Sequence, residues 1–180
     1  MGKLCHISLL EYRMLSFFND YQSPIGKMTI QVNDQGLMGV WFSTQKTIPK
    51  ILGVKSESNA LIIETQSQLN DYFKDLRREF NLPLFLQGTL FQQQAWQALR
   101  KIPFGETRSY LQQAQSIHKP KAVRAIGSAN AKNPISIIVP CHRVIAANGA
   151  LTGHAGGLEL KLWLLDHEKA FSVCVIASLF

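Results

Sequence analysis

Cys141 and His142, which directly follow Pro140, are the residues of this chain best suited to covalent chemistry. A cysteine attacks carbon as the thiolate, and its free pKa leaves only a few per cent ionised near neutral pH, so it needs a base. His142 is the nearest base, but consecutive side chains on a strand face opposite ways. We therefore expect a water molecule between the two side chains. An acidic residue must orient the imidazole, and Glu168 is the candidate.

The apolar run 135–139 is the element that must position these two residues. Its composition predicts a buried strand. Proline has no N–H and cannot continue a strand ladder, so Pro140 should end the strand and turn the next residue out of the sheet. The sequence therefore predicts a nucleophile held at the edge of a core.

Residue type alone allows three other interpretations of Cys141. The first is an inert core thiol, the usual state of an isolated cysteine. The second is a zinc site, with candidate ligands Cys141, His142, His154 and His167. Their spacing does not match the paired spacing of zinc motifs, so we expect no metal. The third is a cysteine hydrolase, which usually needs the thiol at a helix start and a distant histidine, and this fits poorly.

The composition is that of a globular protein, with 180 residues of which 46% are hydrophobic and 17% charged. The three cysteines are too few and too scattered for a disulfide framework, which favours a reducing compartment. No apolar stretch approaches the roughly 20 residues of a membrane helix, and charged residues interrupt the N-terminal apolar segment. We expect a soluble cytoplasmic protein without membrane association.

The net charge of +7 is concentrated in the second half of the chain. Residues 1–87 carry nine Lys and Arg against eight Asp and Glu, whereas residues 88–180 carry ten against four. An inert basic surface explains this as well as a polyanionic partner does, and the commonest such partner is nucleic acid.

Residues 1–87 predict a small α/β domain, with residues 1–13 as a candidate N-terminal extension. Residues 27–32 and 37–42 predict a hairpin, and apolar residues at helical spacing predict a long helix over 59–80. We find no catalytic pattern in this part.

Residues 88–180 predict a mostly helical domain. Helices are expected over 91–102, 109–117, 121–130 and 157–168. The second and third, joined by a short turn, suggest a helix-turn-helix, although such pairs also occur in proteins that never bind DNA. Small residues surround Arg124, which suits either tight helix packing or a helix pressed into a DNA groove with one inserted side chain.

The motif Pro140-Cys141-His142-Arg143-Val144 closely resembles the active-site signature of the O6-alkylguanine-DNA alkyltransferases, also called methylated-DNA–protein-cysteine methyltransferases. Further blocks resemble the family in order and spacing: Phe104-Gly105-Glu106, Ser109-Tyr110, Pro120 to Gly127, Asn133-Pro134, Gly156-Gly157, and Trp163-Leu164-Leu165 through His167-Glu168. The resemblance covers residues 88–168 strongly and residues 20–87 loosely.

The resemblance implies an α/β two-domain protein. The N-terminal domain would be ribonuclease-H-like, and the C-terminal domain winged-helix-like with a helix-turn-helix. It implies irreversible, stoichiometric transfer of an alkyl group from O6-alkylguanine in double-stranded DNA to Cys141 after nucleotide flipping, with O4-alkylthymine as a further candidate substrate. It implies no cofactor and a monomer. The alternative is a module that binds alkylated DNA or regulates transcription without transfer.

The resemblance also assigns roles to individual residues. Arg124 would fill the space of the flipped nucleotide, with Ala122 and Gly127 on the same DNA-binding helix. His142 and Glu168 would take the thiol proton through water. Asn133 would orient the region around the thiol, and Tyr110 would donate to the guanine ring. The remaining substrate contacts would be the Val139 carbonyl, the Ala155 N–H and Gly156.

Three positions need separate expectations. Arg143 belongs to the motif, but we expect it to anchor the motif through a buried ion pair. His154 stands where the family commonly has an aromatic residue, and we expect the loop to keep its shape. Gln113 stands at a position that is usually leucine. We expect weaker local packing around Gln113.

Overall fold

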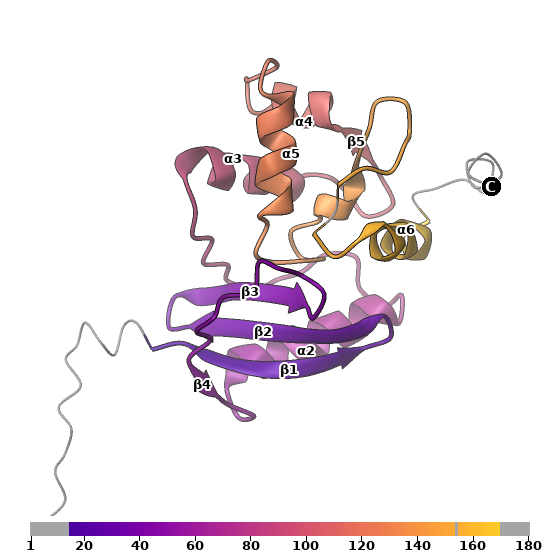
Figure 1. The fold of residues 1–180 in the computed structure, drawn as a ribbon. Helices are drawn as coiled ribbons and strands as arrows, with labels where there is room; N and C mark the ends of the chain where they lie inside the picture. Colours follow the sequence, from indigo (N-terminus) through magenta and orange to yellow (C-terminus); the bar gives the residue numbers. More distant parts are fainter. Residues whose placement is uncertain (1–14, 154, 170–180) are drawn as a thin grey trace, which may run out of the picture.

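The computed structural model describes residues 15–153 and 155–169 (Figure 1). The candidate extension 1–13, His154 and the apolar segment 171–180 therefore lie outside the described residues. A four-stranded sheet with one covering helix forms the N-terminal part, and a group of helices lies beyond one edge of that sheet (Figure 1).

The sheet has the strand order β3-β2-β1-β4. Its strands are β1 (Phe17–Ser23), β2 (Gly26–Asn33), β3 (Gly36–Phe42) and β4 (Val54–Lys55). Strands β1, β2 and β3 are antiparallel neighbours, which confirms the predicted hairpin, and β4 runs parallel to β1. At the turn, the Asn33 side chain accepts from the N–H groups of Gln35 and Gly36. Gly36 has a φ of +147°, and a Cβ there would lie 2.6 Å from the Pro83 carbonyl oxygen.

Helix α2 (Ala60–Phe73) packs on the sheet through Ile62, Leu69 and Tyr72. It begins at Asn59, whose side chain accepts from the backbone N–H groups of residues 61 and 62. The predicted end at residue 80 was wrong, because the chain adopts a φ of +60° at residue 75 just after the helix. Phe80 still packs against the core from the following loop, so the apolar spacing continues beyond the helix.

The C-terminal part contains the four predicted helices, each within a few residues of its expected ends. Its elements are α3 (Leu90–Leu99), β5 (Arg108–Ser109), α4 (Tyr110–Ser116), α5 (Val123–Ala131), the 3-10 helix η1 (Cys141–Arg143), β6 (Val144–Ile145) and α6 (Leu158–His167). Capping boxes at Thr89 and Ser109 start α3 and α4. Strands β5 and β6 form a short parallel pair.

The predicted strand over 135–139 was wrong. Only Ile135 forms a bridge, with Val40 of β3, and turns carry the chain from there to η1. Ile137 has a φ of +70°, which is incompatible with a strand. This segment is apolar because it is buried between the sheet edge and the helices, not because it extends a ladder.

The two parts meet along β3. The loop after α2 bridges the edge of β3 at Leu84, close to the Ile135 bridge. One apolar cluster joins both parts, including Val40 of the sheet, Trp96 of α3 and Leu164 of α6. The segment that leads into Cys141 is therefore fixed by both parts of the molecule.

Gln113 does not weaken the packing of α4, contrary to our expectation. It is buried and exchanges two hydrogen bonds with the Asn130 amide of α5, at 3.1 and 2.8 Å. Its Nε2 also donates to the carbonyl of Ala95 in α3. A satisfied polar pair thus joins three helices at a position where leucine would only make apolar contacts.

Candidate active site

Cys141 begins η1 and is 7% exposed. Burial raises the pKa of its thiol, while a hydrogen bond with the Asn133 side chain and the positive charge of Lys161 lower it. The residue as a whole is buried. A reactive thiolate at this position therefore needs an adjacent base.

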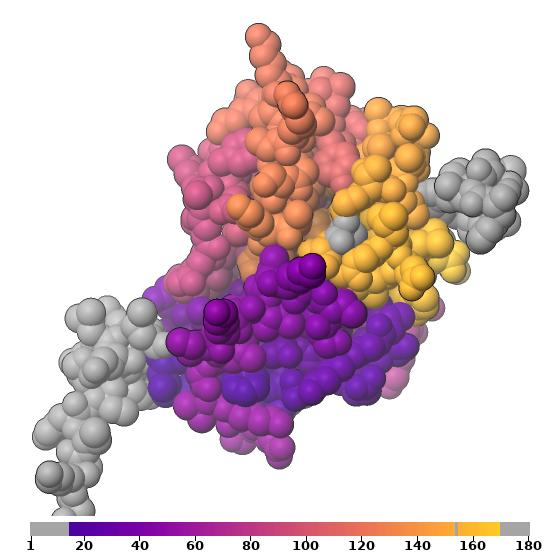
Figure 2. All heavy atoms as spheres, in the orientation of Figure 1, coloured from indigo at the N-terminus to yellow at the C-terminus, as the bar shows by residue number. Residues whose placement is uncertain are grey.

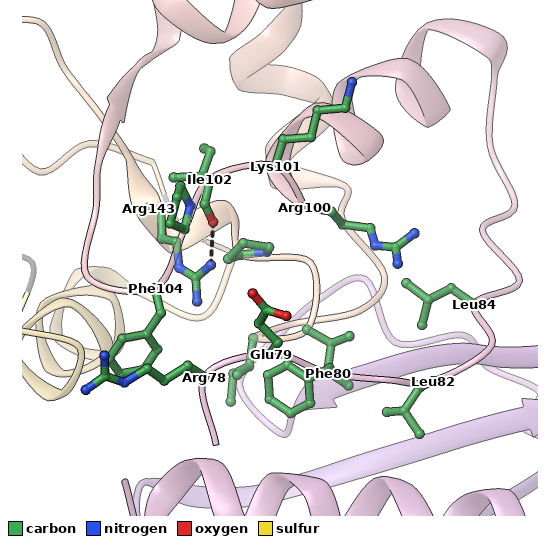
Figure 3. A pocket seen from close by; sticks show the side chains of 14 residues that line it. Arg78, Glu79, Phe80, Leu82, Leu84, Arg100, Lys101, Ile102, Phe104 and Arg143 are labelled. Atoms are coloured by element: carbon green, nitrogen blue, oxygen red, sulfur yellow. Dashed lines mark hydrogen bonds between the residues drawn. The ribbon is translucent and has the colours of Figure 1, made fainter. Parts of the chain in front are cut away.

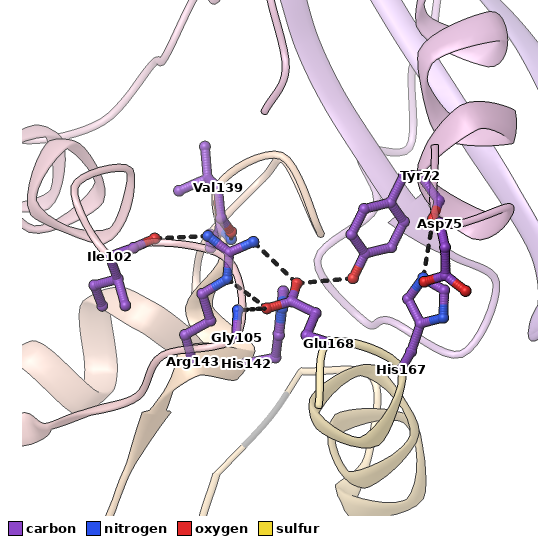
Figure 4. A network of polar contacts seen from close by, with 10 residues as sticks. Tyr72, Asp75, Ile102, Gly105, Val139, His142, Arg143, His167 and Glu168 are labelled. Atoms are coloured by element: carbon purple, nitrogen blue, oxygen red, sulfur yellow. Dashed lines mark hydrogen bonds and ion pairs between the residues drawn. The ribbon is translucent and has the colours of Figure 1, made fainter. Parts of the chain in front are cut away.

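Glu168, at the C-terminal end of α6, is the centre of a buried polar network (Figure 4). Its Oε1 accepts from His142 Nε2 at 2.8 Å and from Tyr72 OH at 2.8 Å. Arg143 donates from Nε to Oε2 at 2.7 Å and from Nη2 to Oε1 at 2.9 Å. Burial alone would raise the pKa of Glu168, but the hydrogen bonds and charges of His142 and Arg143 hold the pKa well below its ordinary value. Glu168 is therefore ionised.

His142 has one occupied and one free ring nitrogen. An ionised carboxylate only accepts hydrogen bonds, so Nε2 must carry the hydrogen that it shares with Glu168. Nδ1 is buried and has no hydrogen-bond partner among the described residues, which leaves its lone pair available. Burial lowers the pKa of His142, Glu168 opposes this shift, and Arg143 and Lys161 add to it. The neutral imidazole is thus a base oriented through its other nitrogen.

Arg143 anchors the motif, as expected from the sequence. Besides its two bonds to Glu168, its Nη1 donates to the Ile102 carbonyl at 2.6 Å, and its guanidinium lies 5.9 Å from the centre of the Phe104 ring. Because these partners come from α6 and from the loop after α3, the ion pair ties three segments together behind Cys141.

Hydrogen bonds of the Asn133 side chain hold the backbone turn that leads to Cys141. The Asn133 Nδ2 donates to the Val139 carbonyl at 2.7 Å, and its Oδ1 accepts from the Ile135 N–H at 3.1 Å. The Val139 carbonyl also accepts from the Cys141 N–H at 2.9 Å. Asn133 thus holds both ends of the turn that precedes Cys141.

Tyr110, the first residue of α4, faces the loop before α6. Its hydroxyl donates to the Thr152 carbonyl at 3.0 Å. Burial raises its pKa, and the negative charge of an ionised Cys141 adds to that shift, so the phenol stays protonated beside the thiol. Ala155 and Gly156 are half-buried on the same loop.

The three predicted DNA-binding residues lie on or beside α5. Arg124 is exposed, and Ala122 and Gly127 are half-buried. A Cβ at Gly127 would lie 3.9 Å from the Tyr110 ring. Figure 2 shows α5, in orange, on the surface between α3 and the loop that leads to α6.

Lys161 and Tyr72 were missed in the sequence analysis. Lys161 is fully buried on α6, and its Nζ donates to the carbonyls of Val144 and Thr152 at 2.6 and 2.8 Å. Burial lowers its pKa to about 8. The sequence did carry a signal for this burial. Lys161 precedes Leu164 and Leu165 by three and four residues, which places it on the apolar face of the helix. For Tyr72, 96 residues from Glu168, no local pattern gives the contact.

The cavity in Figure 3 has a volume of about 500 Å³, and Ile137, Ile138 and Pro140 line it while Cys141 does not. Its lining includes Arg78, Arg100, Phe104 and Arg143. None of the described residues predicted to contact substrate lines it. Within residues 15–153 and 155–169, no group of three His, Cys, Asp or Glu side chains is arranged to hold a metal, and no helix is long and apolar enough to cross a bilayer.

Two family models match most of the chain. The 6-O-methylguanine DNA methyltransferase ribonuclease-like domain matches residues 17–86, and the DNA binding domain of the same family matches residues 90–170. The protein is thus one in which a ribonuclease-like domain is joined to a DNA-binding domain. Our division at residue 87 stays a prediction.

Similar proteins cover nearly the whole described chain. A methylated-DNA–protein-cysteine methyltransferase of Mycobacterium leprae is 48% identical over 82% of this chain and 88% of its own length. One of Methanosarcina acetivorans is 43% identical over 84% and 97%. The crystal structure of Mycobacterium tuberculosis OGT in complex with DNA has a TM-score of 0.80 at 42% identity, covering 86% of this chain and 93% of that one. The chain belongs to the methylated-DNA–protein-cysteine methyltransferase family, which confirms the resemblance seen in the sequence.

Proposed function

We propose that Cys141 accepts the alkyl group of O6-alkylguanine in double-stranded DNA and so restores guanine directly. The observation that carries this proposal is the position of the thiol. Cys141 directly precedes His142 in η1, and an ionised carboxylate holds the neutral imidazole of His142 at Nε2, while Nδ1 has no partner among the described residues. Membership of a family of methylated-DNA–protein-cysteine methyltransferases supplies the reaction. The protein is a DNA repair methyltransferase that acts by direct reversal.

The transfer is a single displacement. The Cys141 sulfur attacks the alkyl carbon, an S–C bond forms, and the bond from that carbon to guanine O6 breaks with its electron pair left on the base. The thiol proton passes through a water molecule to Nδ1 of His142, which Glu168 holds through Nε2. The Tyr110 hydroxyl, which donates to the Thr152 carbonyl without DNA, would turn its one hydrogen toward the guanine ring as negative charge develops there. Lys161 still donates to that carbonyl, so it keeps a partner.

The product explains why the protein is used once. S-alkylcysteine is a thioether and has no good leaving group, so no second half-reaction returns the thiol. The reaction needs a thiolate, alignment and a stabilised leaving base, and we expect no cofactor.

Substrate recognition requires the damaged nucleotide to leave the duplex. Helices α4 and α5 would act as a helix-turn-helix within a winged-helix-like domain, with Arg124 inserted into the space of the flipped nucleotide. Ala122 and Gly127 would let α5 approach the DNA closely. The exposed side chains Lys119, Lys121 and Lys132 support this arrangement, because they surround α5 with positive charge.

The flipped base would be held by the backbone. The Val139 carbonyl oxygen would accept from the guanine exocyclic amine. The same oxygen accepts from the Asn133 amide and the Cys141 N–H in the structure. The Ala155 N–H would donate to O6, and Gly156 would leave room for the ring. O4-alkylthymine is the further substrate to compare, and we expect the protein to act as a monomer.

The test is intact-mass spectrometry after incubation with a duplex that contains one O6-methylguanine. We expect one methyl group per protein chain and no further uptake when the substrate is in excess. The Cys141→Ala variant should gain none. Binding of the lesion duplex with no mass change in the wild type would contradict the proposal and indicate a non-catalytic module.

A further inference from the structure

Tyr72 joins the N-terminal part of the molecule to the reactive site. It is fully buried in the last turns of α2, and its hydroxyl donates to Glu168 Oε1 at 2.8 Å (Figure 4). Its ring makes edge or tilted contacts with Phe73, Phe80 and Phe104. The hydroxyl is therefore held in one place by surrounding aromatic residues.

A second contact fixes the same residue. The Nε2 atom of His167, the residue before Glu168, lies 2.9 Å from the carbonyl oxygen of Tyr72. Its ring stacks on Trp163 with centroids 5.0 Å apart. The end of α2 is thus attached to the end of α6 through both the backbone and the side chain of Tyr72.

The shared oxygen gives this contact a chemical consequence. Glu168 Oε1 accepts from Tyr72, His142 and Arg143 together. A carboxylate oxygen that receives an additional strong donor attracts each of its other donors less. Tyr72 therefore weakens the attraction of Glu168 for the proton of His142, while it fixes the carboxylate plane that orients the imidazole.

We propose that Tyr72 is a positioning residue for alkyl transfer, which holds Glu168 so that His142 stays correctly oriented and unprotonated as the base for Cys141. This inference rests on the proposed function. It makes the ribonuclease-like domain a working part of the site, although the sequence shows no catalytic pattern there.

Several charged groups act on His142 and on Tyr72. His142 is influenced by Glu168, Arg143 and Lys161. Glu168, Arg143 and Asp75 act on Tyr72, whose pKa burial raises so far that the hydroxyl remains a donor throughout the accessible pH range. Replacing tyrosine by phenylalanine changes none of these charges.

The experiment compares Tyr72→Phe with Tyr21→Phe in the full chain. Tyr21 is also buried, and its hydroxyl donates to Asn70 Oδ1 at 2.8 Å on the same helix, so this control loses an equivalent bond away from Glu168. Two quantities are measured: the pH profile of the methyl-transfer rate, and the NMR titration of the His142 ring in DNA-free protein.

For Tyr72→Phe we expect about a tenfold lower rate near neutral pH, as for other residues that support a ligand or base from behind. The acid limb of the profile and the His142 titration should both move to higher pH, because the carboxylate attracts the imidazolium more strongly. Tyr21→Phe should match the wild type in both.

Incorporation of 3-fluorotyrosine at position 72 keeps the ring and strengthens the donor, so the His142 titration should move to lower pH. This measurement also covers the case in which Tyr72→Phe does not fold. Unchanged His142 titrations in these variants, or a rate loss that is the same at every pH, would overturn the inference. If the wild type takes up no methyl group while the titrations shift as expected, the proposed function fails and the effect of Tyr72 on His142 stands.

Discussion

The Glu168 cluster (Tyr72, His142, Arg143 and Glu168) and the proposed substrate face (Tyr110, Arg124 and residues 150–153 and 155–157), below called the substrate face, differ in how their polar groups are satisfied. Each Glu168 oxygen accepts from charged or aromatic donors that are themselves buried. On the substrate face, Arg124 is exposed, and the Tyr110 hydroxyl lies 3.0 Å from the Thr152 carbonyl oxygen and 3.5 Å from that of Gly153. The contrast indicates that the base is arranged before DNA arrives, whereas the proposed substrate face is more exposed and less tightly bonded.

The largest effect should come from Glu168→Gln. The substitution removes the counter-charge of a buried Arg143, and breaking such a pair costs about 3–5 kcal/mol. We expect a decrease of that order in the free energy of unfolding, measured with denaturant, together with loss of transfer. Asp71→Asn, which removes a more exposed partner of Arg77, is the control and should change stability by less than about 1 kcal/mol. If both substitutions lower the free energy of unfolding equally, the buried Glu168 cluster contributes no more to stability than a partly exposed ion pair.

Lys161 lies between the two regions and predicts a pH dependence. Its pKa falls from 10.5 to about 8 in the folded protein. The unfolded chain binds more protons between these values, so the contribution of Lys161 to stability rises with pH across this window. We expect the wild type to gain about 2 kcal/mol relative to Lys161→Met between the two values, after allowance for screening. Parallel stability curves would show that the lysine keeps an ordinary pKa.

A smaller effect is expected behind the substrate face, at Gln113. Gln113→Leu leaves the buried Asn130 amide unpaired, which should cost about 1–2 kcal/mol in thermal or chemical unfolding. The double variant Gln113→Leu with Asn130→Leu should recover most of this loss. If the single variant is as stable as the wild type, the amide pair does not support α4 and α5.

The smallest change in stability should accompany Arg124→Ala. Because the side chain is exposed, we expect less than about 0.5 kcal/mol. If Arg124 has the proposed role, transfer from a duplex should slow by about tenfold, since the space of the flipped nucleotide would no longer be filled. The control Lys132→Ala also removes an exposed cation beside α5 and should slow transfer much less. Equal losses would assign both residues to nonspecific phosphate binding.

Sequence reasoning succeeded where local rules decide the structure. The hairpin and the helix starts predicted at residues 59, 91 and 109 follow from strand alternation and helical apolar spacing, and each start lies within one residue of the observed one. The contact of Glu168 with His142 follows from the family pattern. It failed at 135–139, because an apolar run indicates burial and does not distinguish a strand from buried turns.

The missed residues have a common physical reason. Tyr72 and Glu168 are far apart in the chain, and their contact depends on how the two parts pack. Lys161 would be read as a solvent-exposed charge unless the burial of its helix face is known. In both cases the chemistry depends on distant partners, which residue type and spacing do not reveal. The roles of Asn133, Val139, Ala155 and Gly156 remain predictions.

Peptide mapping by tandem mass spectrometry after reaction with the O6-methylguanine duplex tests the central claim most directly. The account predicts a single methyl group on the sulfur of Cys141, with Cys5 and Cys174 unmodified. A methyl group on either of these cysteines, or on no cysteine while the lesion disappears from the DNA, would contradict it.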